Sequence, residues 1–375
     1  MIGRYVWLAE WARWTRHRCP ADDGGGAVVY LPGHLGDFLE ATPMLRRLRE
    51  AWEGRRIVWL VGSWGAALAR RFGAYCDEVA VFSPALPNLS RGQQPQGAWE
   101  QWRLLQRLSK AGVRALVATR IEDAVTRFLA NMLRPGIWTG LGDRRPPRVA
   151  REVATSLVPY DPRKPEAEAL ADLLVPLGIS SRGVGTAFWV EEDGDAGRAE
   201  EFLRAEAVAV DRPLVLVSAG SGWEGKNWGG RHFAEVAFAM EKSGAQVAWI
   251  GTEDEKALKP AGAAGRDWFG RLDIGTLASV MKRAALWIGN DSGPLHLAAA
   301  VGCKTLSLWG PTDPEKWAPL GEGNHVVRKV VARCPGCVYW DWRQHCLKAA
   351  HECMDAISPE EVSVLAREIL AMKRT

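Results

Sequence analysis

Residues 287–310 read WIGNDSGPLHLAAAVGCKTLSLWG, and this one stretch contains the repeating unit of the fold. An apolar run ends at Asn290-Asp291, and Ser292-Gly293-Pro294 then opens a helix. A second β-branched and aromatic run follows at Thr305–Trp309. A strand, a helix and another strand in this order predict a parallel βαβ unit.

Similar runs alternate with helical patterns along most of the chain and fall into two groups. The candidate strands of the first group are Ala27–Leu31, Ile57–Val61, Val79–Phe82, Ala115–Thr119 and Ile137–Leu141. Those of the second group are Leu214–Ser218, Gln246–Ile250, Leu286–Gly289 and Thr305–Trp309. We therefore expect an α/β protein with two Rossmann-like, doubly wound parallel-sheet domains. Ligands of such sheets bind at the carboxyl ends of the strands, here in a cleft between the domains.

A stretch with Gly, Ser and an acidic run, Glu191–Asp195, separates the two groups and marks the expected domain boundary. The expected division is an N-terminal extension over residues 1–26, a first Rossmann-like domain over 27–180, a linker region over 181–212, a second Rossmann-like domain over 213–357 and a C-terminal helix over 358–375.

The composition is that of a globular protein, because 47% of the 375 residues are hydrophobic and 25% are charged. Lys and Arg total 48 against 44 Asp and Glu, a formal net charge of +4 that does not indicate a nucleic-acid partner. Seven cysteines without a secretory signal favour a reducing, cytoplasmic compartment.

The N-terminal segment bears on membrane association. No apolar run in the chain reaches the roughly 20 residues that span a bilayer. Charged residues interrupt the first 20 residues, which argues against a secretory signal. Trp7, Trp11 and Trp14 lie there among basic residues, so an interfacial helix at the inner membrane stays open. Arginine groups within residues 46–56 and 144–151 could meet an anionic ligand or simply be solvated.

The first candidate site is the turn after the first strand, within residues 31–49. Gly33 and Gly36 allow a tight strand-to-helix turn that presents backbone N–H groups to an anion and places Asp37 at the start of the helix. Asp37 could instead be only a helix cap. The spacing is not the Gly-x-Gly-x-x-Gly of dinucleotide-binding dehydrogenases.

The second candidate is Lys226, in the glycine-rich loop that follows Leu214–Ser218. An ammonium group there could neutralise a phosphate, or Lys226 could be an exposed loop lysine without a ligand. The loop lacks the Gly-Lys-Ser/Thr ending of a P-loop.

The third candidate is the helix start at Ser292-Gly293-Pro294. The first N–H groups of a helix have no partner within it, so they form an anion site, with His296 near the same end. Asp291 and Ser292 could alternatively be helix caps, and His296 a core residue.

These motifs together resemble those of the heptosyltransferases of glycosyltransferase family 9. The matching residues, in chain order, are Gly36-Asp37 with Thr42-Pro43, Lys226 before Trp228, Asp291–His296, and Gly310–Pro314 with Trp317. The resemblance covers most of residues 27–370. It implies a GT-B fold and an ADP-heptose donor bound mainly by the second domain. It also implies an acceptor bound by the first domain, inversion at the anomeric carbon and no cofactor for catalysis.

The resemblance also implies roles for individual residues. Asp37 resembles the general base, and Gly36, which precedes it in the turn, is expected to bind substrate. Lys226 and the helix start at Ser292, Gly293 and Pro294 look like the clamp on the diphosphate. Glu253 or Glu255 is similar to the acidic residue that contacts the nucleoside, and the choice between the two stays open. Asp291 and His296 would line the donor site.

The acceptor is the less determined partner. The first expectation is a glycolipid, the lipopolysaccharide inner core, and the second is a protein serine or threonine hydroxyl. A non-catalytic nucleotide-sugar-binding subunit and a nucleotide-sugar epimerase are the alternatives from other classes. An oligomer is compatible with the sequence.

Two further motifs concern metals. Asp193-Gly194-Asp195 imitates the Asp-x-Asp metal motif of GT-A transferases but lies in the linker, so we expect a turn. Cys334, Cys337, Cys346 and Cys353 have a spacing that could close a structural zinc or iron site, or they could be reduced thiols.

Overall fold

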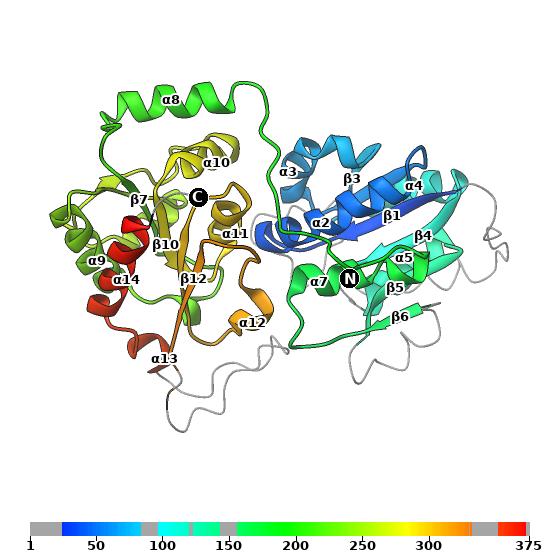
Figure 1. The fold of residues 1–375 in the computed structure, drawn as a ribbon. Coiled ribbons are helices and arrows are strands. Elements are labelled where there is room, and N and C mark those ends of the chain that lie inside the picture. The colour runs from blue at the N-terminus through cyan, green and yellow to red at the C-terminus, as the bar shows by residue number, and fades with distance from the viewer. Residues whose placement is uncertain are drawn as a thin grey trace. The chain divides into compact units, whose positions relative to one another are not determined.

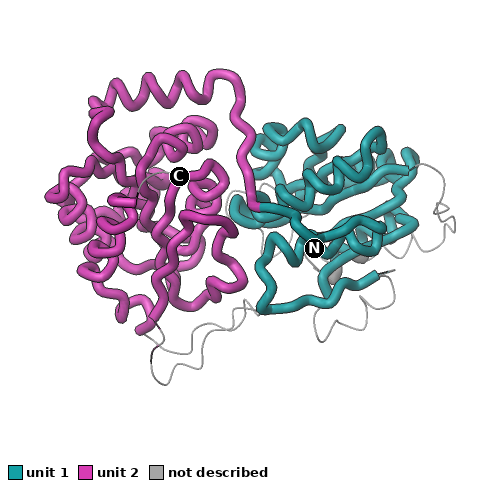
Figure 2. Tube along the Cα trace, in the orientation of Figure 1, with its two compact units in different colours: residues 1–185 teal, residues 186–375 magenta. Residues whose placement is uncertain are grey.

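The computed structural model describes residues 25–83, 97–119, 123–142, 156–329, 331 and 352–372. The chain divides into two compact units, residues 1–185 and residues 186–375 (Figure 2). The N-terminal tryptophans and the arginines of residues 144–151 lie outside the described residues.

Unit 1 is built on a six-stranded parallel sheet (Figure 1). Its strands are β1 Gly26–Leu31, β2 Ile57–Val61, β3 Glu78–Val81, β4 Val113–Ala118, β5 Ile137–Gly142 and β6 Ser156–Pro159. They lie side by side in the order β3-β2-β1-β4-β5-β6, and every neighbouring pair is parallel.

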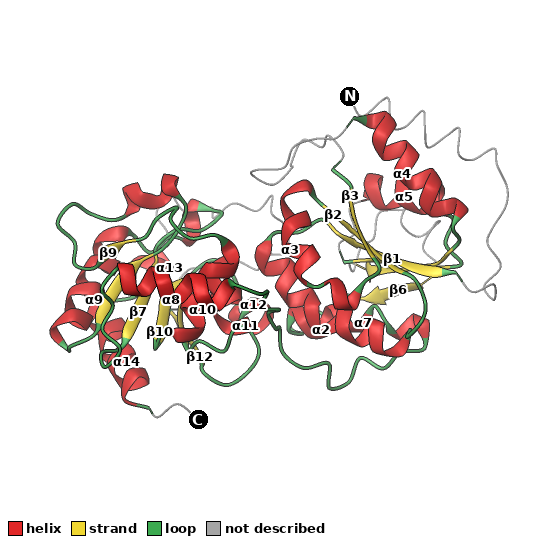
Figure 3. Cartoon of the chain, turned by 90° about the horizontal axis from the view of Figure 1, so that it is seen from above, coloured by secondary structure: helices red, strands yellow, loops and turns green. Residues whose placement is uncertain are grey.

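Helices cover both faces of this sheet (Figure 3). They are α2 Leu35–Ala51, α3 Ala66–Arg71, α4 Ala98–Lys110, α5 Asp123–Leu133 and α7 Glu166–Asp172, with short 3-10 turns at Ser63–Gly65, Gly73–Tyr75 and Val175–Leu177. Helix α2 packs with α7 and α4 with α5. The inner strands β1, β4 and β5 and their neighbour β2 are almost entirely buried, as expected of a parallel sheet with helices on each side, whereas β3 and β6 at the edges are partly exposed.

Unit 2 repeats this topology. Its strands are β7 Leu214–Ser218, β8 Gln246–Trp249, β9 Arg266–Asp267, β10 Leu286–Asn290, β11 Thr305–Trp309 and β12 Asn324–Arg328. Their order is β12-β11-β10-β7-β8-β9, all parallel. Numbered within its own unit, each sheet has the strand order 3-2-1-4-5-6 of the Rossmann fold. The predicted class, two doubly wound α/β units, is therefore confirmed.

Helices precede, connect and follow these strands along the chain. They are α8 Asp195–Ala205, α9 Gly230–Lys242, α10 Ile274–Arg283, α11 Gly293–Ala300, α12 Pro314–Trp317, α13 Glu352–Asp355 and α14 Pro359–Ala371, with 3-10 segments η4 Glu224–Lys226 and η5 Glu253–Leu258. The core between α9, α14 and the sheet is apolar and fully buried.

Every predicted strand is present, and β2, β7 and β11 have the predicted bounds. Three strands were not predicted. Strand β6 ends on a proline, β9 has only two residues, both charged, and β12 is a partly exposed edge strand with the sequence NHVVR. Apolar patterning cannot identify strands of this kind, because their pairing depends on a neighbour already in place.

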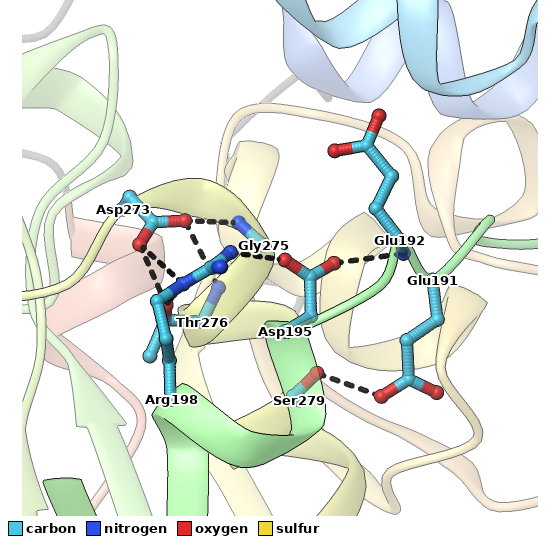
Figure 4. A network of polar contacts seen from close by, with 8 residues as sticks. All are labelled: Glu191, Glu192, Asp195, Arg198, Asp273, Gly275, Thr276 and Ser279. Carbon is cyan, nitrogen blue, oxygen red and sulfur yellow. Dashed lines mark hydrogen bonds and ion pairs between the residues drawn. The ribbon is translucent and has the colours of Figure 1, made fainter. Parts of the chain in front are cut away.

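Hydrogen bonds connect α8, and the acidic residues that lead into it, to α10 (Figure 4). Residues 193 and 194 form the predicted turn, but Asp195, which was included in it, is the first residue of α8. The buried Asp195 carboxylate accepts hydrogen bonds from the Glu192 N–H at 3.0 Å and from Arg198 at 2.5 Å. Arg198 also donates to Thr276 Oγ1, at 3.2 Å, in the first turn of α10. Asp195 therefore has a structural role in this linker.

Candidate functional site

The turn between β1 and α2 holds Asp37 against the backbone. Asp37 is the third residue of α2, and its Oδ2 accepts a hydrogen bond from the His34 N–H at 2.6 Å. A Cβ on Gly33 would lie only 2.4 Å from the Asp37 Cβ, so this approach requires glycine. Asp37 is therefore not the N-cap, which is His34, but the N3 residue of a capping box, and it lies half-buried at the carboxyl end of β1.

Thr42-Pro43, part of the same motif, lies inside α2. Proline has no N–H, so Pro43 cannot donate to the Leu39 carbonyl one turn earlier. The Thr42 hydroxyl donates to that carbonyl instead, at 2.7 Å. The Thr42 hydroxyl therefore satisfies the Leu39 carbonyl that Pro43 leaves without an N–H donor.

Three side chains of unit 2 meet at the carboxyl ends of neighbouring strands. Lys226 follows β7, Asp291 follows β10 and Thr312 follows β11, and these strands are adjacent in the sheet. Lys226 Nζ lies 3.1 Å from Asp291 Oδ2, and Thr312 Oγ1 donates to the same oxygen at 2.8 Å. Asp291 is buried. The structure thus brings the predicted Lys226 and Asp291 together.

Asn290 anchors the loop that carries Lys226. This fully buried side chain donates to the Ala219 carbonyl at 2.8 Å and accepts from the Trp228 N–H at 3.1 Å, one residue on each side of the loop. The sequence reasoning gave Asn290 no role, and it quoted Thr312 only as part of the Gly310–Pro314 motif. The available signals were an amide at the end of a buried strand and a hydroxyl three residues after the end of the next strand.

Helix α11 begins just after Asp291 of this cluster in the sequence. Ser292 is the residue before the helix, with Gly293 and Pro294 in its first turn. The Ser292 hydroxyl makes no cap hydrogen bond, and within the described part of the chain its buried Oγ has no hydrogen-bond partner. Pro294 has no N–H, and the Leu295 N–H donates to the Ser292 carbonyl at 3.1 Å. The Gly293 N–H, the buried Ser292 hydroxyl and the nearby ammonium group of Lys226 are therefore the groups that suit an anionic ligand. His296 is buried in the next turn of the same helix.

The two glutamates after β8 differ in environment. Glu253 has a side chain that is 71% exposed and lies 3.9 Å from Lys256. Glu255 is half-buried and accepts a hydrogen bond from the Thr252 N–H at 2.9 Å. Its Oε1 would lie 2.0 Å from a Cβ on Gly220, the second residue after β7. Glu255 is therefore the glutamate that approaches the strand end preceding the Lys226 loop.

Both polar sites lie where the strand order of their sheet reverses. In unit 1 this point is between β1 and β4, and Asp37 follows β1. In unit 2 it is between β7 and β10, and Lys226 and Asp291 follow these two strands. Open α/β sheets bind ligands at this position.

Several arginines of unit 1 form ion pairs near the amino ends of β2 and β3. Arg49 pairs with Asp77, and Arg56 and Arg107 pair with Glu78. The hydrogen bond from Arg107 lowers the pKa of Glu78 against a smaller opposing effect of burial, and Arg56 adds to the lowering. The Cys76 thiol beside this cluster has a pKa raised to about 12, chiefly by burial. These arginines stabilise the fold and do not lie with Asp37.

The structure describes one of the four cysteines that were predicted to bind a metal. Cys353 lies in α13, whereas Cys334, Cys337 and Cys346 lie outside the described residues. The Cys353 Sγ lies close to Gly310, since a Cβ atom added to that glycine would be only 3.1 Å away from it. Among the described residues, no three His, Cys, Asp or Glu side chains are grouped as a metal site.

Comparison with known proteins matches unit 2 to a family. Residues 188–339 match the model of "Glycosyltransferase family 9 (heptosyltransferase)", which confirms the predicted resemblance over those residues. A "Lipooligosaccharide heptosyltransferase 2" of Campylobacter jejuni is 28% identical over 42% of this chain, and the chain spans about half of that relative's length. A "Lipopolysaccharide heptosyltransferase 2" of Salmonella typhimurium is 25% identical over 81% of this chain and 88% of its own.

Solved structures share the fold over most of the chain. The "glycosyl transferase family 9 from Veillonella parvula" aligns with a TM-score of 0.76 and 20% identity over 95% of this chain and 99% of its own. An "iron-containing dodecameric glycosyltransferase TibC" from enterotoxigenic E. coli aligns with a TM-score of 0.57 and 15% identity, over 94% of this chain and 77% of its own. None of the helices in the described ranges is long and apolar enough to cross a membrane.

Proposed function

We propose that this chain, whose residues 188–339 match glycosyltransferase family 9, is an inverting heptosyltransferase that uses ADP-heptose. The observation that carries the proposal is the group formed by Lys226, Asp291 and the start of α11 at the point where the strand order of unit 2 reverses. That group suits the diphosphate of a nucleotide-sugar.

Unit 2 supplies the donor site in this proposal. Lys226, the Gly293 N–H at the start of α11 and the Ser292 hydroxyl bind the diphosphate and stabilise the charge that develops on departing ADP. Glu255 accepts hydrogen bonds from the nucleoside, because it approaches the β7 strand end while Glu253 points to solvent. Asp291 and His296 line the donor site near the sugar.

Unit 1 supplies the base. Asp37 accepts the proton of the acceptor hydroxyl as its oxygen attacks the anomeric carbon of the heptose. The new carbon–oxygen bond forms as the bond to the ADP oxygen breaks, which inverts the anomeric configuration. The His34 N–H holds the Asp37 carboxylate in place. No catalytic metal takes part in the proposed reaction.

The first-choice acceptor is the lipopolysaccharide inner core, on the strength of the named relatives in Campylobacter and Salmonella. This acceptor places the enzyme in the cytoplasm, at the inner membrane. A protein hydroxyl is the second choice. The second choice, an oligomer and a structural zinc or iron at the four cysteines draw support from the dodecameric, iron-containing TibC, which shares the fold.

Mass analysis of reaction products tests the proposed activity. The protein is incubated with ADP-heptose alone and with either class of acceptor, and released ADP is measured in parallel. We expect one heptose added to the acceptor and one ADP released, only when the acceptor is present. Turnover of the nucleotide-sugar without an acceptor would favour an epimerase. Transfer from UDP-sugars as fast as from ADP-heptose would contradict the donor assignment.

A further inference from the structure

One carboxylate oxygen in unit 2 is shared by two donors from different strands. Asp291 Oδ2 lies 3.1 Å from Lys226 Nζ and accepts a hydrogen bond from Thr312 Oγ1 at 2.8 Å. Asp291 is 6% exposed and Thr312 is 3% exposed. In the proposed diphosphate site, Lys226 is therefore paired with the Asp291 carboxylate. The buried Thr312 hydroxyl donates to the same carboxylate oxygen.

This arrangement makes Lys226 the mobile member of the cluster. Its side chain is 20% exposed, so a ligand can reach it, whereas Thr312 is enclosed. Asn290 holds the backbone of the lysine loop on both sides, at Ala219 and Trp228. Movement of the ammonium group is therefore a change in side-chain rotamer and leaves the loop in place.

Moving Lys226 to a ligand has a cost at Asp291. A buried carboxylate that loses its cation is left poorly solvated, which favours keeping the lysine where it is. A hydroxyl that donates to the same oxygen lowers this cost, because the carboxylate keeps a charge-assisted hydrogen bond after the lysine has left.

We infer that Thr312 is a positioning residue that keeps Asp291 hydrogen-bonded while Lys226 transfers from Asp291 to the diphosphate of the donor. The inference rests on the proposed function, in which Lys226 binds that diphosphate. Thr312 contacts neither donor nor acceptor, and its whole effect passes through the charge of Asp291.

A double-mutant cycle with ADP as the probe tests this inference. Thr312→Val keeps the shape of the side chain and removes the hydroxyl. We expect it to weaken ADP binding by about 5- to 20-fold in calorimetry, a typical coupling for residues in one hydrogen-bond network. Thr312→Ser should restore affinity to within about twofold of wild type, because it restores the donor. In an Asp291→Asn background, Thr312→Val should change affinity less than about twofold, since no carboxylate then retains the lysine.

The outcomes separate the possible roles of Thr312. An equal loss of affinity in both backgrounds would mean that Thr312 contacts the ligand or acts through general stability, and would overturn the inference. Unchanged affinity in Thr312→Val would also overturn it. If that variant does not fold, Thr312→Cys, whose thiol is a weak donor, enters the same cycle with the same criteria. Equal ADP affinity in wild type and Lys226→Ala would instead contradict the proposed function itself.

Discussion

The two units have the same strand order but carry different chemistry at the same topological position. In each sheet the first strand is followed by a glycine-containing turn at the point where the order reverses. In unit 1 this turn holds the carboxylate of Asp37 against the His34 N–H. In unit 2 the corresponding loop holds the ammonium of Lys226 against Asp291, beside the start of α11.

The difference shows that topology determines where a ligand site forms, while a few side chains determine what it does. A carboxylate can take a proton from a hydroxyl but repels phosphate. An ammonium with helix N–H groups attracts phosphate but cannot act as that base. We therefore expect variants of the two positions to impair different steps, and the following predictions test that separation.

The largest effect is expected for Asp37→Asn. Loss of a general base typically lowers the rate about 10²–10⁴-fold, so turnover at saturating donor and acceptor should fall by at least about 100-fold. Asparagine can still accept the hydrogen bond from the His34 N–H, so the thermal midpoint should be nearly unchanged. Turnover above about a tenth of wild type would mean that Asp37 is not the base.

The second effect is expected for Lys226→Ala. Loss of a charge-assisted contact typically costs about 1.5–3 kcal/mol, so ADP affinity should fall by roughly 10- to 150-fold in calorimetry. Lys242→Ala is the matched control, because Lys242 lies in the same unit at the exposed end of α9. Should both variants bind ADP as wild type does, the ammonium of Lys226 plays no part in the donor site.

A smaller effect should distinguish Glu255 from Glu253. Replacing a charged acceptor with a neutral one typically costs about 1 kcal/mol, so Glu255→Gln should weaken ADP binding by about fivefold. Glutamine can still accept from the Thr252 N–H, which preserves the local turn. Glu253→Gln should leave affinity unchanged, since that side chain is largely exposed. The reverse ranking would assign the nucleoside contact to Glu253.

The smallest effect concerns charges of unit 1 at the opposite end of its sheet. The pKa of Glu78 is lowered in the folded state, so its ion pairs stabilise the fold above the unfolded pKa of about 4.3 and lose that effect as the pH falls through the folded pKa. Glu78→Gln should lower the thermal midpoint by about 1–3 °C at pH 7, a difference that shrinks in acid. Glu53→Gln is the control, since Glu53 is exposed and forms no ion pair with another described residue. A midpoint difference for Glu78→Gln that is the same at pH 7 and at pH 3 would contradict the ion-pair explanation.

The sequence predicted the fold well because both sheets are parallel and buried on both faces. Strands such as Ile57–Val61 are then continuous apolar runs, which patterning detects directly. The exposed edge strand Asn324–Arg328 has no such run. For the site in unit 2, the sequence indicated Lys226 and Asp291 as parts of separate motifs. The structure adds that their side chains form an ion pair.

The contacts that hold the site together could not be predicted from the sequence. Asn290 bonds to residues 71 and 62 positions away, and Thr312 bonds to a residue 21 positions away. Such pairings exist only once the strands have assembled, so no local pattern encodes them. Gly33 differs from these residues, because its contact with Asp37 is local and the sequence predicted a tight glycine turn there.

Calorimetry of ADP binding to wild type, Asp37→Asn and Lys226→Ala under identical conditions tests the central claim most directly. The account predicts that Asp37→Asn binds ADP within about twofold of wild type while Lys226→Ala binds at least about 10-fold more weakly. A loss of ADP affinity in Asp37→Asn as large as that in Lys226→Ala would contradict the division of work between the two units.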